Sequence, residues 1–258
     1  MKAHVDIDRA TAPSFVLEDE LRPFRSAWHA HRRHQLLYSR RGALRLEAEG
    51  RQWLVPPQRA AWLCAGVSHR VSASAPVSLR TAYLARPLGA GLSGCRVFEL
   101  PQVGRALLEH GVRWGPASSG RDALARQYFA VLAALAREWA ATPDRFGLPA
   151  AGSEAMDRAM ALGLARLDAP PLVAEVARHV AMSPRSFQRQ FLAETGSSWR
   201  TFVLQARMLR AMELLAAPGA RVTQVAMALG FASFGAFTRA FSRLAGQAPS
   251  EYARRASG

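Results

Sequence analysis

The sequence predicts an α+β fold in which an antiparallel β domain precedes an all-α domain with two helix-turn-helix units. From Pro13 to about Leu100, short segments of alternating polar and apolar residues are separated by Gly and Pro, which is typical of a small antiparallel β structure. Beyond residue 153 the periodicity is helical, and a pattern of about 30 residues occurs twice, about 50 residues apart. The β and α elements are therefore segregated along the chain.

The composition is that of a globular protein with an excess of positive charge. The chain has 258 residues, half of them hydrophobic, which is enough for two domains. A net charge of +15 predicts attraction to a polyanion, although every basic residue except Lys2 is Arg and a GC-rich genome explains part of the excess. Residues 170–258 contain 11 Arg and four Glu (net +7), and residues 1–169 contain 23 Lys+Arg and 15 Asp+Glu (net +8). The excess per residue is higher toward the C-terminus.

No targeting or redox motif is evident. The N-terminus, MKAHVDIDRA, has acidic residues where a signal peptide has an apolar stretch, and no run approaches the roughly 18 apolar residues of a membrane span. Cys64 and Cys95 match no disulfide framework or CxxC pair. We expect a cytoplasmic protein with no membrane partner, in which both thiols contribute to core packing.

Two helices are predicted between the β part and the repeat. The longer one spans SSGRDALARQYFAVLAALAREWAA, and its predicted apolar face consists of Leu124, Tyr128, Val131, Leu132, Leu135 and Trp139. This face either packs on the β domain or forms a dimer interface. The stretch ATPDRFGLPAAG, with two prolines and two glycines, is the predicted linker. The expected organisation is a β domain at 1–100, a helical linker or dimerisation segment at 101–142, and a helix-turn-helix domain at 153–258.

The internal repeat aligns LVAEVARHVAMSPRSFQRQFLAETGSSWRTF with RVTQVAMALGFASFGAFTRAFSRLAGQAPSEY. Early matches such as Val176 and Val225 are 49 residues apart, and later ones such as Phe187 and Phe237 are 50 apart. The turn between the two helices of a unit can accommodate this one extra residue. Each unit is therefore predicted to form a short helix, a tight turn and a second helix.

In the first unit, Ser183 is the predicted N-cap of the second helix and Pro184 its first residue. Phe187 and Phe191 are one turn apart and point inward. The outer faces then carry side chains of the kinds that reach base edges and phosphates, namely Arg185, Ser186, Gln188 and Arg189.

In the second unit, Gly230 supplies the turn, Ser233 is the predicted cap, and Phe237 and Phe241 pack inward. The residues predicted to face outward are Gly235, Thr238, Arg239 and Arg243. One such helix would fit a bundle with a solvated arginine face. Two copies of the same pattern favour a DNA-binding domain.

At these residues the chain resembles the AraC/XylS family of transcription regulators. The second unit, VAMALGFASFGAFTRAFSRLAGQAPSEYARR, contains the family's Ala with Gly-Phe four residues on, Phe-x-x-x-Phe, Gly and Pro-Ser-x-Tyr. The resemblance implies that the helix WRTFVLQARMLRAMELLAA joins the two units rigidly. Two recognition helices would then enter major-groove segments about one DNA turn, roughly 34 Å, apart.

The resemblance also implies which positions contact bases. In the first recognition helix these are Arg185, Gln188 and Arg189. In the second they are Phe234, Gly235, Thr238 and Arg239. The family usually has polar side chains at the positions of Phe234 and Gly235, so we expect less direct base readout by the second unit. Phosphate contact by Arg239 and Arg243 then gains importance.

The N-terminal half contains a second chemical pattern. His29 and His31 alternate on a predicted strand, so both imidazoles point to one face, and neighbouring strands can bring Gln35 and His69 beside them. Three imidazoles and one oxygen donor suit a divalent transition metal. His34 is expected on the face opposite Gln35 and is not counted.

These residues resemble the cupin barrel pattern HxHxxxE followed by Gly, with a second block PxGxxH. The resemblance implies that residues 1–100 form a cupin-like antiparallel barrel that senses a signal. Gln35 stands where the pattern has Glu, and Cys64 where it has Pro. Because Gln is a weaker, neutral ligand, three interpretations stay open. The residues His29, His31, Gln35 and His69 hold a metal, line a pocket for a small-molecule effector, or remain from a metal-binding ancestor.

The combined expectation is a one-component regulator and not an enzyme. It would bind double-stranded promoter DNA without a cofactor, respond to a metal or small-molecule effector, form a homodimer and contact RNA polymerase. Two alternatives stay open. A metal-dependent cupin enzyme with a helical appendage rests on the His/Gln set alone, and an RNA-binding or architectural protein would show salt-sensitive binding without sequence discrimination.

Overall fold

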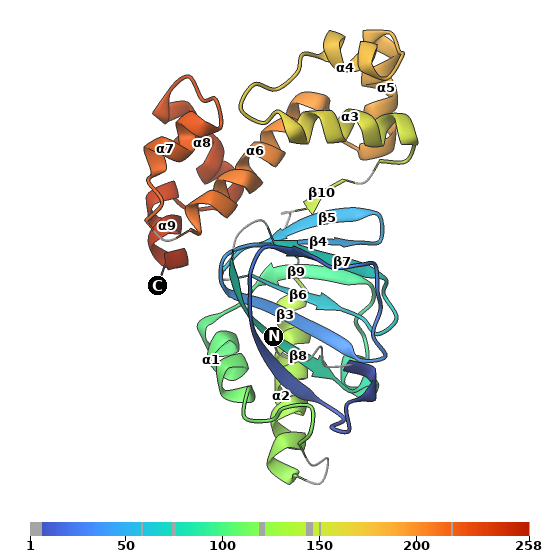
Figure 1. Cartoon of the computed structure of the whole chain (residues 1–258), viewed down its shortest axis with the longest axis vertical. Helices are drawn as coiled ribbons and strands as arrows, with labels where there is room; N and C mark the ends of the chain where they lie inside the picture. The colour runs from blue at the N-terminus through green and yellow to red at the C-terminus, as the bar shows by residue number, and fades with distance from the viewer. Residues whose placement is uncertain are drawn as a thin grey trace. The chain divides into compact units, whose positions relative to one another are not determined.

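The computed structural model describes residues 7–57, 59–73, 76–118, 122–142, 147–149, 151–217 and 219–257. The chain forms two compact units (Figure 1). One contains residues 1–49 and 53–146, and the other contains residues 50–52 and 147–258.

The first unit consists of two antiparallel sheets, as the sequence predicts. The first sheet has the strand order β1-β8-β3-β6-β9, and the second contains β5-β4-β7-β2 in that order. The strands are β1 (Phe15–Leu21), β2 (Phe24–Arg25), β3 (His34–Arg41), β4 (Leu44–Ala48), β5 (Arg51–Val55), β6 (Arg59–Leu63), β7 (His69–Ala73), β8 (Val77–Leu84) and β9 (Cys95–Glu99). Two short 3₁₀ helices, η1 (Ile7–Arg9) and η2 (Arg86–Gly89), flank them.

The core of this unit lies in two layers, one between the sheets and one outside the first sheet. Leu37 and Leu63 face the second sheet, where they pack with Leu44 and Val71. The alternate residues of the same strands face outward and pack under two helices, α1 (Gln102–Gly111) and α2 (Ala123–Ala140). Because both faces of the first sheet are covered, β8 is buried along its whole length instead of alternating in burial.

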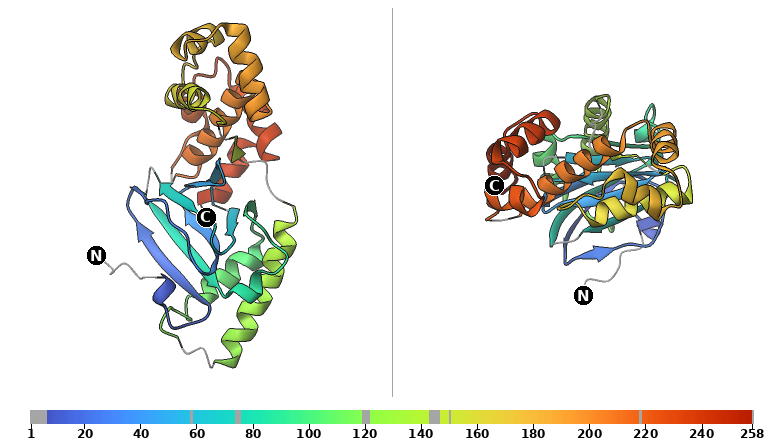
Figure 2. Two further views of the ribbon diagram at one scale, coloured as in Figure 1. Left: turned by 90° about the vertical axis from the view of Figure 1, so that its right-hand side faces the viewer. Right: turned by 90° about the horizontal axis from the view of Figure 1, so that it is seen from above.

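Helices α1 and α2 belong to the first unit and are not a separate segment at 101–142. Figure 2 shows both helices, in green, on one side of the sheets. The predicted apolar face of α2 is divided: Tyr128 and Leu132 are buried on the sheet, while Leu124 and Val131 are 55% and 53% exposed. The Asp122 carboxylate caps the helix, accepting bonds from two backbone N–H groups, and it also accepts one from Trp114 Nε1 at 2.8 Å.

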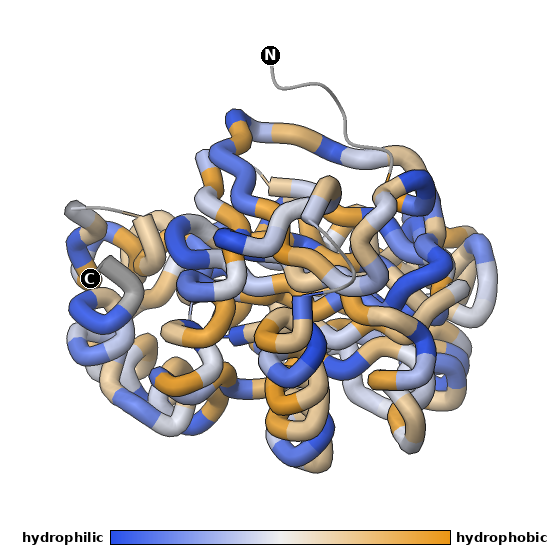
Figure 3. The backbone as a smooth tube through the Cα atoms, turned by 90° about the horizontal axis from the view of Figure 1, so that it is seen from below, coloured by the Kyte–Doolittle hydropathy of each residue, from blue (hydrophilic) through white to orange (hydrophobic). Residues whose placement is uncertain are grey.

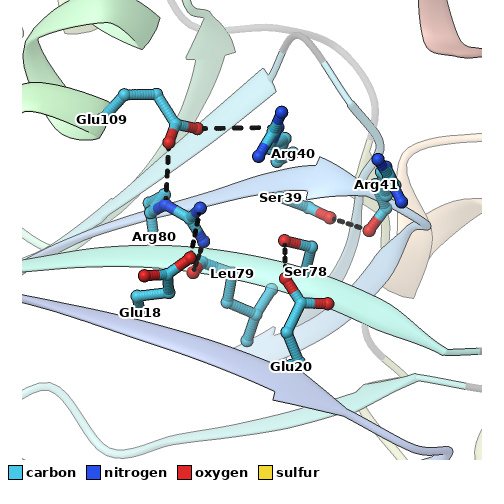
Figure 4. Close-up of polar contacts among 9 residues, drawn as sticks. All are labelled: Glu18, Glu20, Ser39, Arg40, Arg41, Ser78, Leu79, Arg80 and Glu109. Atoms are coloured by element: carbon cyan, nitrogen blue, oxygen red, sulfur yellow. Dashed lines mark hydrogen bonds and ion pairs between the residues drawn. The ribbon is translucent and has the colours of Figure 1, made fainter. Parts of the chain in front are cut away.

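A buried arginine forms ion pairs that link α1 to the first sheet (Figure 4). The side chain of Arg80 on β8 is 3% exposed, and it contacts Glu18 on β1 at 2.6 Å and Glu109 on α1 at 3.0 Å. Glu109 also lies 3.9 Å from Arg40. A buried guanidinium is tolerated only with such partners, so the position of α1 depends on this network.

The two cysteines pack in different layers, Cys64 with the outer core and Cys95 with the inner one. Burial raises the pKa of the Cys95 thiol to about 12 and also raises the pKa of Cys64. Both thiols are therefore protonated near neutral pH, which is the state of a packing residue.

Besides the first two residues of β5, the second unit contains the short strand β10 (Gly147–Leu148), which falls within the predicted linker, and its other elements are helices. Residues 143–146 and 150 of that linker lie outside the described residues. The helices are α3 (Glu154–Ala165), α4 (Val173–His179), α5 (Pro184–Thr195), α6 (Trp199–Leu215), α7 (Val222–Ala228), α8 (Phe234–Ala245) and α9 (Pro249–Ser257). Helix α6 is continuous and contacts α3, α5, α7, α8 and α9. Both predicted helix-turn-helix units are thus present, joined by one helix.

Polar residues interrupt the apolar ones along most elements (Figure 3). Among the described residues, no helix has the length and hydropathy needed to cross a membrane.

Candidate nucleic-acid interface and imidazole cluster

The start of α5 is determined by its cap. Ser183 Oγ accepts a bond from the Ser186 N–H at 3.1 Å, and Pro184 is the first helical residue, as predicted. Phe187 and Phe191 are fully buried, and their rings contact Trp199 of α6. This packing fixes how α5 is rotated about its axis.

The rotation leaves Arg185, Gln188 and Arg189 exposed on the outer side of α5. Ser186 is half-buried, and its hydroxyl accepts a bond from Ser183. Among the described residues, no acidic group lies within ion-pair distance of Arg185 or Arg189. Both guanidiniums are therefore available to phosphate or to a guanine edge.

The second unit repeats this construction. Ser233 Oγ accepts a bond from the Ala236 N–H at 3.2 Å, and Phe237 and Phe241 are fully buried. Gly235, Arg239 and Arg243 are exposed, as expected. The described part of the chain offers these two arginines no ion-pair partner.

Thr238 differs from the expectation of an outward-facing polar group. Its residue is half-buried, and its Oγ1 is buried without a hydrogen-bond partner among the described residues. The cause is its place one residue from Phe237, at the border of the inward face of α8.

The two turns have the same backbone path with different residues. Gly230 has φ +67°, and its counterpart Ala181, 49 residues earlier, has φ +56°. In each turn the next N–H, that of Met182 or Phe231, reaches back five residues to a carbonyl of the preceding helix at 2.8 or 3.1 Å. The one-residue slip of the repeat falls directly after this turn.

Two residues that position the recognition helices were missed at the sequence level. Trp199 Nε1 donates to the Pro171 carbonyl at 3.2 Å, so the same side chain supports both α5 and the loop before α4. Arg207 of α6 donates to the Leu229 carbonyl, and its Cζ lies 4.1 Å from the centroid of the Phe231 ring. Burial lowers the pKa of Arg207. The sequence of α6 has no pattern that distinguishes an arginine with such a structural contact from an arginine exposed to solvent.

The imidazole cluster forms, but not in the predicted way. His29 and His31 do not alternate on a strand; they lie in the segment between β2 and β3. An isolated bridge to His69, the first residue of β7, holds His29, with N···O distances of 3.0 and 2.8 Å. The prediction of a strand was therefore wrong, although the three rings lie 4.3 to 5.5 Å apart.

Backbone carbonyls set the tautomers of two of these rings. His29 Nδ1 lies 2.9 Å from the Ala27 carbonyl, and His69 Nδ1 lies 2.9 Å from the Val67 carbonyl. A carbonyl can only accept, so each Nδ1 carries the hydrogen and each Nε2 offers a lone pair. His69 Nε2 is buried and has no partner among the described residues.

Burial disfavours the charged form of two of these imidazoles. Burial, followed by the proximity of His29 and His69, lowers the pKa of His31 to about 4. Burial also lowers the pKa of His69. One potential ligand atom from each of His29, His31 and His69 lies within 4.8 Å of the others. Three imidazoles that converge in this way form a donor set for a divalent transition metal.

Gln35 and His34 occupy opposite faces of β3, as expected. Gln35 is paired with Leu63 on the inner face of the sheet, and its Oε1 is buried without a partner among the described residues. It is also paired with Tyr83, whose ring lies 5.3 Å from that of His31. His34 stacks on Trp62, and both of its ring nitrogens are engaged by backbone groups.

Two family models match the chain, one in each unit. Residues 12–91 match the AraC-like ligand binding domain, and residues 176–255 match a helix-turn-helix domain. The second range contains both turns and both recognition helices. The chain belongs to the AraC family of transcription regulators. Its C-terminal unit is a DNA-binding helix-turn-helix domain.

Named relatives of this AraC-family member are also regulators. It is 27% identical to the HTH-type transcriptional regulator NimR of Escherichia coli K12, over 97% of this chain and 90% of that protein. It is 42% identical to the uncharacterized HTH-type transcriptional regulator Mb1430 of Mycobacterium bovis over 85 residues, which are 33% of this chain and 24% of that protein. The alternative of a metal-dependent cupin enzyme finds no support among these relatives.

The AraC-family chain also aligns with solved structures. ToxT of Vibrio cholerae O395 is matched over 95% of this chain and 98% of that one, with 14% identity and a TM-score of 0.41. An AraC-type regulator of Chromobacterium violaceum is matched over 40% of this chain and 92% of that one, with 24% identity and a TM-score of 0.39.

Proposed function

We propose that the protein is a one-component transcription regulator that binds a specific promoter sequence through α5 and α8 and responds to an effector in the β unit. The observation that carries this is the pair of capped recognition helices on the single helix α6, each with outward arginines that have no acidic partner among the described residues. A cytoplasmic location is part of the proposal, since its target is promoter DNA.

The first unit would supply most of the sequence specificity. Arg185 and Arg189 can each make two hydrogen bonds to guanine, and Gln188 can do so with adenine. In the second unit, Arg239 and Arg243 are the polar side chains best placed for contact, and guanidiniums without base partners bind phosphates. We therefore propose that α5 makes most of the base contacts. Helix α8 would mainly contact phosphates and set the distance between the two bound segments of DNA.

Arg189→Ala tests this division. If Arg189 reads a base, the substitution weakens binding to the preferred promoter fragment by about 1–3 kcal/mol and relaxes the preference at one position. The measurement is a gel-shift titration on the protein's preferred fragment, found by selection from random DNA, and on single-base variants of that fragment.

The matched control is Arg158→Ala. Arg158 lies on α3 and is already paired with Glu154 at 2.9 Å, so its loss should leave binding unchanged. An equal loss with Arg189→Ala on every DNA sequence would assign Arg189 to phosphate. Wild-type binding without any sequence preference would favour the architectural alternative instead.

Two protein partners belong to the same proposal. A homodimer is supported by the exposed outer side of α2, where Leu124 and Val131 lie. RNA polymerase is proposed as a partner because the family consists of transcription regulators. No cofactor is proposed for DNA binding itself.

For the effector, the imidazole cluster favours a divalent transition metal. The residues that would hold it are His29, His31 and His69, through the Nε2 lone pairs that the Ala27 and Val67 carbonyls orient in two of them. Gln35 is the candidate oxygen donor, because its buried Oε1 has no other partner among the described residues. A bound cation would fix the segment before β3 against β7 and supply a positive charge inside the sheet pair.

Titration of chelator-treated protein with Co²⁺ tests the metal. We expect one equivalent to bind with the visible absorption of nitrogen-coordinated cobalt, and His69→Ala to weaken binding at least tenfold. His110→Ala is the control, because His110 is exposed on α1, outside the cluster. Wild-type protein that binds no stoichiometric Co²⁺, Ni²⁺ or Zn²⁺ would leave the cluster as the lining of a small-molecule pocket.

A further inference from the structure

The second recognition helix presents an aromatic ring to solvent at its first residue. Phe234 begins α8 and is 52% exposed, whereas Phe187, Phe191, Phe237 and Phe241 are fully buried. The cap at Ser233 fixes the backbone of this first turn. The N-terminal residues of a recognition helix are the ones that contact base edges in the major groove.

Gly235, the residue after Phe234, adds no side chain to this exposed end of the helix. A Cβ added to Gly235 would come within 4 Å of one group only, Arg239 Nη1 at 3.3 Å. Phe234 therefore has a residue without a side chain beside it, and the Arg239 guanidinium lies close to that residue. With no side chain on Gly235, the helix can approach the groove closely at this point.

The chemistry of the ring selects one base. In the major groove only thymine presents an apolar group, its C5-methyl, whereas the edges of guanine, adenine and cytosine present hydrogen-bonding atoms. A phenyl ring satisfies none of those atoms, so desolvating them against it is unfavourable. Contact with a methyl group carries no such penalty and buries apolar surface.

We propose that Phe234 contacts the C5-methyl group of a thymine, so that the second unit reads one base through an apolar contact. This rests on the proposed function, because it presupposes specific promoter binding. Arg239 and Arg243, both farther along α8, then contact the phosphate backbone. The second unit is consequently selective at one position, although it lacks the polar readers of α5.

The test replaces thymines by deoxyuridine, which removes the methyl group and leaves base pairing intact. The preferred site is first located by footprinting, and each thymine of the half bound by the second unit is replaced in turn. Removing one methyl contact should weaken binding about three- to fivefold at a single position. Phe234→Ala should weaken binding to thymine DNA. The variant should bind equally well whether thymine or deoxyuridine occupies that position.

Two further variants sharpen the result. Phe234→Leu keeps an apolar side chain and should keep part of the uridine sensitivity. Leu192→Ala removes another exposed apolar side chain, near the end of α5, and should keep all of it. Thermal melting of each variant checks that the fold is unchanged.

Three outcomes would overturn the inference. Wild-type protein could bind thymine and uridine DNA equally at every position. Phe234→Ala could retain the sensitivity, which would assign it to another residue. Phe234→Ala could bind DNA normally but lose transcription with RNA polymerase in vitro, which would make the ring a protein contact. Wild-type protein without any specific site contradicts the proposed function itself, a result distinct from all three.

Discussion

At the residue scale, the two turns of the repeat show how one backbone conformation constrains sequence. A left-handed φ is inexpensive for Gly and costs Ala roughly 1–2 kcal/mol. Gly230 meets this requirement, and Ala181 does not. A Cβ on Gly230 would also lie 1.7 Å from the Asp168 carbonyl oxygen, so only glycine fits there.

Exchanging the two residue types should therefore have opposite effects. Ala181→Gly should raise the free energy of unfolding by about 0.5–1 kcal/mol, after the entropy cost of glycine is subtracted. Gly230→Ala should lower it by about 2 kcal/mol or more. Urea denaturation measures both.

Gly219→Ala is the matched control, because Gly219 has φ +74° but no atom within 4 Å of an added Cβ. It isolates the backbone effect, for which we expect a loss of about 1 kcal/mol. A loss as large as that of Gly230→Ala would mean that the contact with Asp168 contributes nothing.

The protonation of His31 gives a second prediction at this scale. Its pKa of about 4 in the folded protein lies below the ordinary 6.5, because burial and the neighbouring His29 and His69 oppose the charge. The unfolded chain then binds more protons between these values, so stability falls as the pH drops from about 6.5 toward 4.

Urea midpoints measured with chelator at pH 7, 6 and 5 should therefore decrease, and His31→Gln should flatten this dependence. His110→Gln, on α1, should leave it unchanged. An unaltered slope in His31→Gln would place the acid sensitivity elsewhere in the protein.

At the element scale, α2 shows that one helix can have two apolar sides. Periodicity groups Leu124 with Tyr128 and Leu132, yet the structure buries the latter two on the sheet and exposes Leu124. Packing on the β unit and self-association are therefore compatible, since each uses its own side of the helix.

Val131→Glu on the exposed side should reduce self-association without unfolding the protein. Each exposed Leu or Val covered in an interface contributes about 1.5–3 kcal/mol, and a buried carboxylate opposes it. Sedimentation velocity at micromolar concentration measures the result. Leu192→Glu on α5 is the control and should sediment as wild type; equal behaviour of both variants would exclude α2 as the interface.

At the scale of the whole molecule, charge and repeat symmetry were the informative sequence signals. The repeat predicted both helix-turn-helix units, their caps and the inward phenylalanines, because local capping and helical periodicity do not depend on distant residues. The excess of basic over acidic residues indicated that the protein binds a polyanion. The division of the chain into a β unit and a helical unit follows from the same segregation of patterns.

The histidine site could be predicted only in part. Residue types and spacing indicated that His29, His31 and His69 converge, but not that two of them lie in an irregular segment. The carbonyls that orient His29 and His69 come from backbone two residues away, and the loop path that allows this has no sequence pattern. The roles of Trp199 and Arg207 were hidden for a related reason, since both depend on contacts more than 20 residues away.

The sequence by itself therefore established the family, the two recognition helices and the residues on their outer faces, because helix periodicity and caps are local properties. Which apolar side of α2 is buried, why Ala181 is strained, and how exposed Phe234 is were settled by the folded chain. These properties depend on packing between elements, and packing is decided by residues that no local pattern connects.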